Sequence, residues 1–403
     1  MALIMIAVIF TMMGIHAETS DCPVDAPKKL MVHYMPWYIS RPFSGQWGWH
    51  WTMDHYNPDE VKQDGKCKIA SHYYPLIGPY DSGDPDALEC QVLLMKFAGI
   101  DGIIIDWYGI EDFYDYAIIN RNTQHIIKYA KKAGLEFAIC YEDQTIKRMI
   151  EAGYMKHEEA VHHGQTVMQW LQKHYFDSKA YLKVDARPAL FVFGPQYFNS
   201  SQWEQVFSVL PQRPFFYTLN YLQGGADGAF GWPPMNGAIT VPDQWRAYLD
   251  DFYVKNSDEA ACVGTVFPQF HDIYEEAGVG KSHGFLDARE GGTFEDTLNL
   301  ALRSDCEVIQ IVTWNDYGEG TMIEPTGEFG YRYLEIIQDY KKQKNGPSFP
   351  YSATDLRIPI ELYQLKKKHQ SNQSVMEDLS KCSNHLFSGN LIAAKSLMKP
   401  PGE

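Results

Sequence analysis

Eight apolar runs of five to ten residues recur along the chain, and segments with helical periodicity separate most of them. The runs are rich in Val, Ile and aromatic residues, and several are continuously apolar, which is typical of parallel strands covered on both faces. They span residues 29–35, 100–108, 135–143, 188–194, 214–220, 228–232, 261–270 and 306–314. The sixth run is the weakest strand prediction, because only seven residues separate it from the fifth.

Helix start and stop signals lie between these runs. Before the second run, Asp84 is a predicted N-cap, Pro85 occupies the first turn and Gly99 is a stop signal. Eight strands alternating with helices predict an α/β fold, a (β/α)8 TIM barrel with right-handed crossovers. A doubly wound open sheet is the alternative, although no glycine-rich phosphate loop follows any run, which disfavours its nucleotide-binding version.

The chain divides into three predicted parts. Residues 1–17 contain an uncharged apolar stretch and a small residue at the cleavage position, which is typical of a signal peptide. A short uncleaved anchor is the alternative, because no Lys or Arg precedes the stretch. Residues 18–345 contain the catalytic barrel, and residues 346–403 form a predicted helical extension packed on it. We therefore expect a secreted or lumenal protein of the secretory pathway, in the ER or Golgi, without stable membrane insertion after signal cleavage.

The amino-acid composition limits the classes of binding partner that we expect. The formal net charge is −16, with 51 acidic and 35 basic residues and no basic run, which disfavours nucleic acid and anionic membranes as partners. The length of 403 residues suits one large barrel, and we expect a monomer. The sequons at Asn199 and Asn372 predict glycosylation if the chain is secreted.

The cysteines and histidines predict no metal site and no cofactor. None of the seven cysteines forms a C-x-x-C pair, and the histidines lack ligand spacing. Three cysteines lie in apolar runs and are interpreted as core thiols: Cys140, Cys262 and Cys306. Four could form disulfides in an oxidising compartment: Cys22, Cys67, Cys90 and Cys382.

Acidic and aromatic residues gather where the predicted strands end. Asp106 follows the second strand, Glu142 the third, and Asp316 and Glu319 the eighth. Catalytic groups of a parallel barrel collect at these carboxyl ends. Aromatic residues at the same ends include Trp37, Tyr38, Trp107, Trp232 and Trp314. Aromatic platforms beside carboxylates indicate a sugar site, because ring faces take the apolar faces of sugars.

Several of these residues also have plainer interpretations. Asp106 could orient neighbouring loops, Glu142 could cap the next helix, and His33 is interpreted as a core histidine. The tryptophan-rich loop at residues 45–56 is either a second aromatic wall or a packing plug. The pair of carboxylates in the last loop is harder to explain without function, because flanking glycines suggest a close backbone approach to a ligand.

The segment TWNDYGEGTMIEP, residues 313–325, resembles the signature WNEW-x-EGT-x-IEP of glycoside hydrolase family 99, the endo-α-mannosidases and their bacterial relatives. Supporting similarity includes MVHYMPWY, WHW, the segment 71–108 and AICYED, so that the resemblance covers roughly residues 29 to 340. It implies a (β/α)8 barrel without metal that cleaves α-mannosidic bonds inside a glycan with retention.

The resemblance also implies residue roles. Asp316 takes the place of the base that deprotonates the sugar 2-hydroxyl, giving a 1,2-anhydro sugar, and Glu319 that of the general acid/base. Glu142 would bind the ring in the cleavage subsite, with Trp107 as a platform. Further substrate-binding candidates are Asp106, Tyr38, Trp37, Asn315, Trp232 and Tyr74. The family Glu is replaced by Asp316, which shortens the reach by roughly 1.5 Å, and a misplacement of this order can cost about 100-fold in rate.

Three functions therefore follow as hypotheses. The first is a retaining endo-acting α-glycoside hydrolase acting on an oligosaccharide or polysaccharide. The second is a catalytically degenerate carbohydrate-binding barrel, in which Asp316 marks a lost base. The third is an α-glycosidase that uses Asp106 or Glu142 with Glu319 in a standard double displacement.

Overall fold

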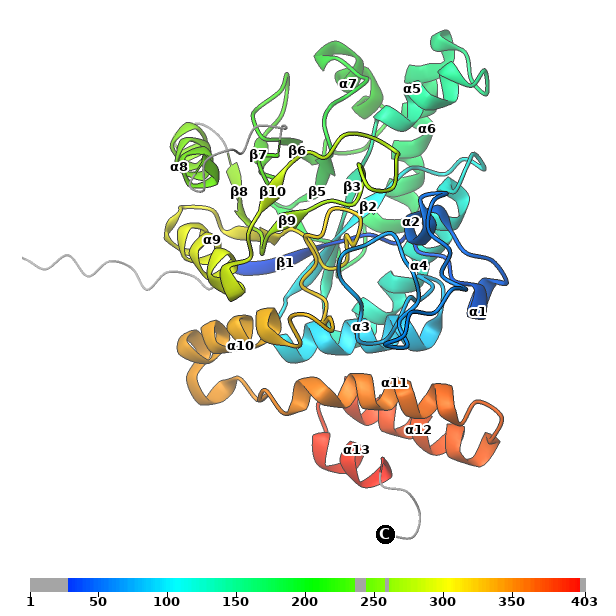
Figure 1. Ribbon diagram of the computed structural model, residues 1–403. Helices are drawn as coiled ribbons and strands as arrows, with labels where there is room; N and C mark the ends of the chain where they lie inside the picture. Colours follow the sequence, from blue (N-terminus) through cyan, green and yellow to red (C-terminus); the bar gives the residue numbers. More distant parts are fainter. Residues whose placement is uncertain (1–27, 236–243, 258–260, 399–403) are drawn as a thin grey trace, which may run out of the picture.

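Eight parallel strands close into a barrel in the computed structural model, which describes residues 28–235, 244–257 and 261–398 (Figure 1). Neighbouring strands follow the order β3-β2-β1-β11-β8-β7-β6-β5, and β3 pairs with β5 to complete the ring. All eight predicted runs are strands, including the sixth, and the TIM barrel prediction is confirmed. The strands are β1 Lys29–Tyr34, β2 Gly102–Trp107, β3 Glu136–Tyr141, β5 Arg187–Val192, β6 Phe215–Leu219, β7 Gly228–Phe230, β8 Ala261–Val266 and β11 Val308–Ile311.

Helices surround the barrel on its outer face (Figure 1). They are α3 Pro85–Ala98, α4 Tyr116–Ala133, α5 Gln144–Glu151, α6 Ala160–Leu171, α7 Ser200–Phe207, α8 Gln244–Ser257, α9 Gly292–Arg303 and α10 Arg332–Asn345. Smaller elements decorate the loops: α1 Arg41–Ser44, α2 Trp49–Thr52, β4 Lys183–Val184, β9 Phe270–His271 and β10 Phe285–Leu286. Single helical turns complete the list, at His157–Glu159, Gln172–Phe176, Arg289–Gly291, Gly346–Ser348 and Asp355–Arg357.

Helix α3 begins and ends at the predicted residues. The Asp84 carboxylate accepts a hydrogen bond from the Asp86 amide at 3.0 Å, which satisfies a donor of the first turn. Gly99 ends the helix at φ +87°, and a Cβ there would lie 2.8 Å from Lys341 Cγ. Only glycine meets both conditions, so α3 stops where α10 crosses it.

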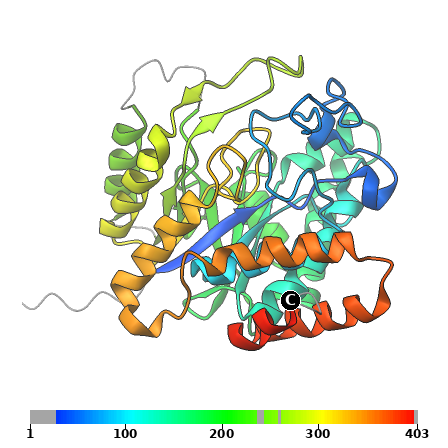
Figure 2. The ribbon, with the colours of Figure 1, turned by 60° about the horizontal axis from the view of Figure 1, so that its bottom comes forward.

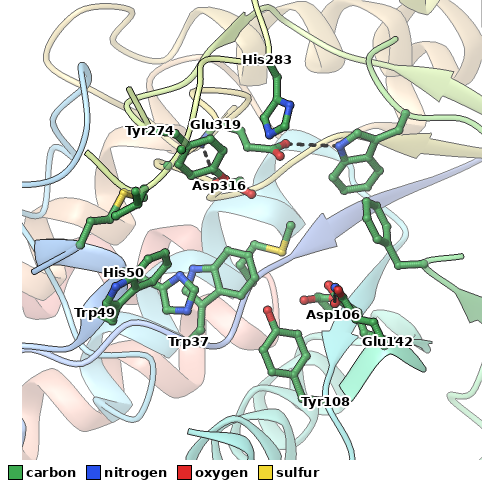
Figure 3. A pocket seen from close by; sticks show the side chains of 18 of the residues that line it. Trp37, Trp49, His50, Asp106, Tyr108, Glu142, Tyr274, His283, Asp316 and Glu319 are labelled. Carbon is green, nitrogen blue, oxygen red and sulfur yellow. Dashed lines mark hydrogen bonds between the residues drawn. The ribbon is translucent and has the colours of Figure 1, made fainter. Parts of the chain in front are cut away.

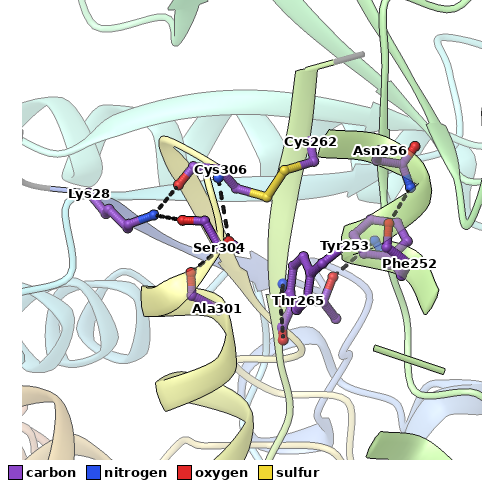
Figure 4. The surroundings of a disulfide bond; sticks show 10 residues. Lys28, Phe252, Tyr253, Asn256, Cys262, Thr265, Ala301, Ser304 and Cys306 are labelled. Carbon is purple, nitrogen blue, oxygen red and sulfur yellow. Dashed lines mark hydrogen bonds between the residues drawn. A yellow bond between two sulfur atoms is a disulfide. The ribbon is translucent and has the colours of Figure 1, made fainter. Parts of the chain in front are cut away.

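A disulfide joins β8 to the segment before β11, which overturns the prediction that Cys262 and Cys306 are free core thiols (Figure 4). The register pairs Val263 with Val308, so the two cysteines lie at the same end of adjacent strands with Cα atoms 5.1 Å apart. Lys28 donates to the Cys306 carbonyl at 2.9 Å on the same surface. The two cysteines pair because β8 and β11 are neighbours in the barrel, and the sequence alone does not reveal which strands are neighbours.

The remaining cysteine predictions have mixed outcomes. Cys140 is a buried free thiol, as expected. Cys67, Cys90 and Cys382 are also free in the described part of the chain, so they form no disulfide with one another, contrary to what the sequence allowed. Cys22 and the predicted signal peptide, residues 1–17, lie outside the described residues. Within residues 28–235, 244–257 and 261–398, no helix has the length and apolar character needed to cross a membrane.

The last helices form an extra layer against α3, seen below the barrel in Figures 1 and 2: α11 Ile358–Lys368, α12 Gln373–Phe387 and α13 Leu391–Leu397. Lys366 of α11 lies 2.6 Å from the Glu89 carboxylate of α3, and both side chains are buried. Ser383 of α12 donates to the same carboxylate oxygen at 2.8 Å. The described part of the predicted extension, residues 346–398, is therefore helical, and the buried Lys366–Glu89 pair helps to tie it to the barrel.

Replacing Lys366 by Met should destabilise the protein strongly. The change leaves the Glu89 carboxylate buried without its cation, which typically costs about 3 kcal/mol or more of unfolding free energy. Urea unfolding followed by circular dichroism measures the loss. Lys381→Met is the matched control, because the Lys381–Asp378 pair is exposed and should contribute nothing measurable. Equal stability of both variants would mean that the buried pair does not hold the extension.

Candidate active site

A cleft of about 730 Å³ opens at the carboxyl ends of the barrel strands (Figure 3). Its walls come from the strand ends, the loop after β1, the start of α5 and the loop after β9. The lining residues are His33, Met35, Trp37, Trp49, His50, Met53, Asp106, Tyr108, Glu142, Gln144, Arg148, Phe193, Trp232, Tyr274, Val279, Gly280, Lys281, Ser282, His283, Asp316, Gly318 and Glu319. This end of a parallel barrel is where catalytic groups are expected.

The loop after β11 brings two carboxylates onto one wall of the cleft. The Asp316 amide donates to Thr313 Oγ1 at 2.8 Å, and the Glu319 amide donates to Asp316 Oδ1 at 2.9 Å. These bonds hold the turn and orient the Asp316 carboxylate. Gly320 adopts φ +67°, and a Cβ there would lie 2.6 Å from the His271 carbonyl oxygen, so glycine is required.

Burial separates the proton affinities of this pair. Loss of solvent raises the pKa of Asp316 to about 6, and its hydrogen bonds from backbone amides limit the rise. Burial raises the pKa of Glu319 well above its usual value, and repulsion from Asp316 adds to the effect. The Trp232 indole donates to Glu319 Oε2 at 3.3 Å and opposes the rise. The pair therefore shows the pattern of a base that ionises first and an acid that keeps its proton.

Asp106 and Glu142 lie on the opposite wall (Figure 3). Burial raises the pKa of Glu142 to about 7, while a hydrogen bond from Gln144 opposes the rise. Burial also raises the pKa of Asp106 well above its usual value, with repulsion from Glu142 and Asp316 as further causes. Neither oxygen of Asp106 has a hydrogen-bond partner among the described residues. Four carboxyl groups thus face one cleft and cannot all ionise easily at neutral pH.

The tryptophan-rich loop is both a wall and a plug. Trp49 and His50 line the cleft, and His50 stacks on Trp37 with ring centroids 4.2 Å apart. Trp51 is fully buried, and its indole donates to the Tyr80 carbonyl at 2.8 Å. Neighbouring residues of one short helix, α2, therefore serve the cleft and the core.

Four of the predicted substrate-binding residues do not line the cleft. Trp107 follows Asp106 in β2, so the alternation of the strand turns its side chain outward, where it stacks on Trp170. Its indole donates to Asn120 Oδ1 at 3.2 Å. Tyr74 lies away from the cleft, and its hydroxyl accepts from the Cys67 amide at 3.3 Å.

The other two are buried supports of the β11 loop. The Asn315 side chain accepts from the Met35 amide and donates to the Met35 carbonyl, at 2.8 and 2.9 Å. The Tyr38 hydroxyl donates to the Asn315 carbonyl at 2.8 Å. Because the polar groups of Asn315 and Tyr38 bond to backbone atoms, they are not available to a substrate. They instead hold the β11 loop in place from the side away from the cleft. The predicted residues that line the cleft are Trp37, Asp106, Glu142, Trp232, Asp316 and Glu319.

Glu324, the third acidic residue of the motif, also has a supporting position. Its carboxylate accepts hydrogen bonds from Tyr80 and Tyr317, both at 2.9 Å, and from Gln91 at 2.8 Å. Burial raises its pKa to about 7. Together, these hydrogen bonds connect the end of the β11 loop to α3, which contains Gln91.

Cleft residues that sequence reasoning missed come from segments without a motif, both loops and a helix. Tyr274 and His283 lie on the long connection after β8, and Arg148 lies in α5. Tyr108 directly follows the β2 strand end. Only Tyr108 carried a usable signal, because it adjoins a predicted strand end, whereas the approach of the other loops depends on tertiary packing.

The glycosylation candidates lie at helix starts on the surface. Asn199 and Asn372 are exposed and cap α7 and α12. Their side-chain oxygens accept from the amides of Gln202 and Val375, at 3.0 and 3.3 Å. Glycosylation itself stays a prediction.

Comparisons with known proteins indicate glycoside hydrolases as the similar proteins. The model of glycosyl hydrolase family 99 matches residues 26–213. Glycoprotein endo-α-1,2-mannosidase of Rattus norvegicus is 24% identical over 378 residues, which cover 83% of this chain and 79% of the rat protein. The resemblance to glycosyl hydrolase family 99 is confirmed over residues 26–213, and together with the similar mannosidases it supports a glycosidase. The matched segment includes Glu142 but ends before Asp316 and Glu319, so the roles of those two rest on the motif.

Other similar proteins extend the same picture. The human glycoprotein endo-α-1,2-mannosidase-like protein is 24% identical over 323 residues, covering 73% of this chain and 68% of the human protein. The solved family 99 endo-α-mannosidase of Bacteroides thetaiotaomicron superposes with a TM-score of 0.58 at 18% identity. That match covers 79% of this chain and 97% of the bacterial chain, and it shows the shared fold.

Replacing Glu319 by Gln should stabilise the protein at pH 8 and leave it unchanged at pH 4.5. The raised pKa of the half-buried Glu319 carboxyl lowers the stability of the folded protein as the pH rises above the unfolded pKa near 4, because only the unfolded chain then ionises freely. Gln cannot ionise, so the variant avoids this loss, with a rise in Tm of roughly 2–4 °C. Thermal unfolding at both pH values measures it, and Glu295→Gln on exposed α9 is the control. A gain of equal size at both pH values would contradict the buried-charge explanation.

Proposed function

We propose that the protein is a retaining, endo-acting α-glycoside hydrolase whose substrate is an α-1,2-mannose-containing glycan. The observation that carries the proposal is the turn at residues 316–319, which holds the buried Asp316 carboxyl and the half-buried Glu319 carboxyl, with unequal proton affinities, on one cleft wall. The mannose assignment comes from the names of the similar proteins, such as the rat endo-α-1,2-mannosidase.

In the proposed reaction, ionised Asp316 removes the proton of the sugar 2-hydroxyl. The freed oxygen attacks its own anomeric carbon, while Glu319 donates its proton to the leaving oxygen and the glycosidic bond breaks. Water then opens the 1,2-anhydro ring: Glu319 takes a proton from the water, and Asp316 returns its proton to the 2-oxygen. Two inversions at one carbon give net retention. The low dielectric of the cleft makes both proton transfers sensitive to the position of the carboxyl groups.

Endo cleavage requires room on both sides of the cleaved bond. A second hollow of about 550 Å³ adjoins the cleft and shares Trp37, Trp49, His50, Tyr108 and Glu142 with it. An aromatic and acidic surface of this kind suits successive sugar rings. The continuous cleft therefore supports binding of a chain of sugars instead of a single terminal one.

A second candidate is a standard double displacement. Asp106 favours it, because both carboxylate oxygens lack partners among the described residues and face the cleft opposite Glu319. Ionised Asp106 would attack the anomeric carbon directly, and Glu319 would protonate the leaving oxygen.

We also propose that the protein resides in the secretory pathway. The Cys262–Cys306 disulfide is a feature of oxidising compartments. Both sequons lie on the exposed surface at Asn199 and Asn372. The expectation of a monomer stays a prediction.

Hydrolysis of a panel of α-linked oligosaccharides tests the assignment. The wild type should cleave an internal α-mannosidic bond, and Asp316→Asn and Glu319→Gln should each lower kcat by about 100-fold or more, because each removes one proton transfer. Glu295→Gln should keep the wild-type rate. Activity of Asp316→Asn together with inactivity of Asp106→Asn would favour the double displacement. Glycan binding without cleavage by the wild type would indicate a carbohydrate-binding barrel.

The pH profile tests the roles separately. The rate kcat/KM should rise with the ionisation of Asp316 near pH 6 and fall at higher pH as Glu319 loses its proton. Trp232→Phe removes the indole donor that stabilises the ionised Glu319, so the pKa of Glu319 rises and the alkaline limb moves to higher pH. Trp203→Phe is the control, since Trp203 is buried in α7. A limb that does not move, or moves to lower pH, would assign the proton donor to another group.

A further inference from the structure

Three potential metal ligands point into the barrel beneath the cleft. The register pairs Asp106 of β2 with Cys140 of β3, so both side chains share one face of the sheet. His33 of β1 pairs with Ile104, which lies two residues before Asp106 and therefore on the same face. The His33 nitrogen, a carboxylate oxygen of Asp106 and the Cys140 sulfur all lie within 4.8 Å of one another.

These groups are buried with unused binding capacity. His33 and Cys140 are fully buried and Asp106 is 2% exposed. His33 Nε2 and both oxygens of Asp106 lack hydrogen-bond partners in the described part of the chain. Buried polar atoms are normally paired, because an unpaired one costs on the order of 1–3 kcal/mol. Three unpaired atoms at one place indicate an occupant.

The neighbouring amide fixes the histidine tautomer. Gln310 donates its Nε2 proton to the Gly231 carbonyl at 3.2 Å, so its oxygen is the acceptor that faces His33 Nδ1 at 3.2 Å. His33 then carries its proton on Nδ1, which leaves the unpaired Nε2 with a lone pair that can bind an ion. Metal-bound histidines are usually oriented by such a second hydrogen bond.

We propose that His33, Asp106 and Cys140 bind one divalent metal ion of the zinc class. Zinc takes nitrogen, oxygen and sulfur ligands at about 2.0–2.3 Å, which places ligand atoms roughly 3.5 Å apart in a tetrahedron. The three atoms must therefore approach by about 1 Å from their greatest present separation. Mg²⁺ and Ca²⁺ are excluded by the sulfur and the nitrogen, because these ions prefer oxygen.

Charge balance also suits a buried ion of this class. On binding, the Cys140 thiol releases its proton to solvent and Asp106 binds as the carboxylate. Two negative ligands and one neutral imidazole cancel the two positive charges of the ion, which limits the cost of burying it. His33 and Asp106 line the cleft and Cys140 lies behind them, so the fourth coordination position opens toward the cleft. The site does not depend on the proposed glycosidase mechanism.

Cobalt(II) added to the metal-free full-length chain tests the site. A single bound ion should give a near-ultraviolet sulfur-to-cobalt charge-transfer band together with visible bands of tetrahedral intensity, and Zn²⁺ should abolish both at one equivalent. Cys140→Ser should lose the sulfur band, and Asp106→Asn should weaken zinc binding by at least 100-fold in isothermal titration calorimetry. Far-ultraviolet circular dichroism checks that each variant is folded.

Matched variants exclude other thiols. Cys90→Ser removes a buried free thiol of α3 and Cys67→Ser a half-buried one, so both should keep the charge-transfer band. Cys22→Ser tests the cysteine outside the described residues in the same way. A band that survives Cys140→Ser, or folded wild-type protein that binds neither ion, would overturn the proposal. The latter result would mean that ordered water satisfies His33 and Asp106.

Discussion

Loss of solvent around the cleft carboxyl groups is the constraint on which the site depends. Asp106, Glu142 and Asp316 are nearly inaccessible to water, and burial is the largest cause of the raised pKa of each. Burying these carboxyl groups at the barrel mouth therefore costs electrostatic free energy, and favourable packing in the rest of the protein must offset this cost. What distinguishes one carboxyl group from the next is the number of donors that reach it: backbone amides for Asp316, an indole for Glu319 and no described donor for Asp106.

The positions of these donors follow from the alternation of side chains along each barrel strand and from the register between neighbouring strands. Each interior position of a strand is followed by one that points toward the helices, which explains why Asp106 faces the cleft and Trp107 does not. The β11 loop is held from behind by Asn315 and Glu324, whose polar atoms bond the β1 end and α3. A rigid support of this kind lets a short turn keep two acids at fixed positions.

Much of the fold could be predicted from the sequence, because buried parallel strands appear in it as continuous apolar runs. Even β7, with three residues, follows from a short run between two turns. The pair Asp316 and Glu319 could also be predicted, since carboxyl ends of strands meet at one rim. The disulfide and the inward approach of Arg148 could not, because both depend on which non-sequential elements become neighbours. Trp107 was assigned to the cleft by resemblance, whereas the period-2 alternation would have placed it outside.

The two walls of the cleft differ in how completely their polar atoms are used. On the β11 side, the Asp316 carboxylate accepts a hydrogen bond from the Glu319 amide, which holds it in one orientation. On the β2 side, Asp106 and His33 leave atoms without partners, and Cys140 lies directly behind them. A carboxylate oriented by a hydrogen bond needs less rearrangement to transfer a proton, whereas a buried group without a partner gains free energy by taking a ligand. The proposed proton transfers and the proposed metal binding thus lie on opposite sides of the same cleft. The two sides differ in how many of their buried polar atoms have hydrogen-bond partners.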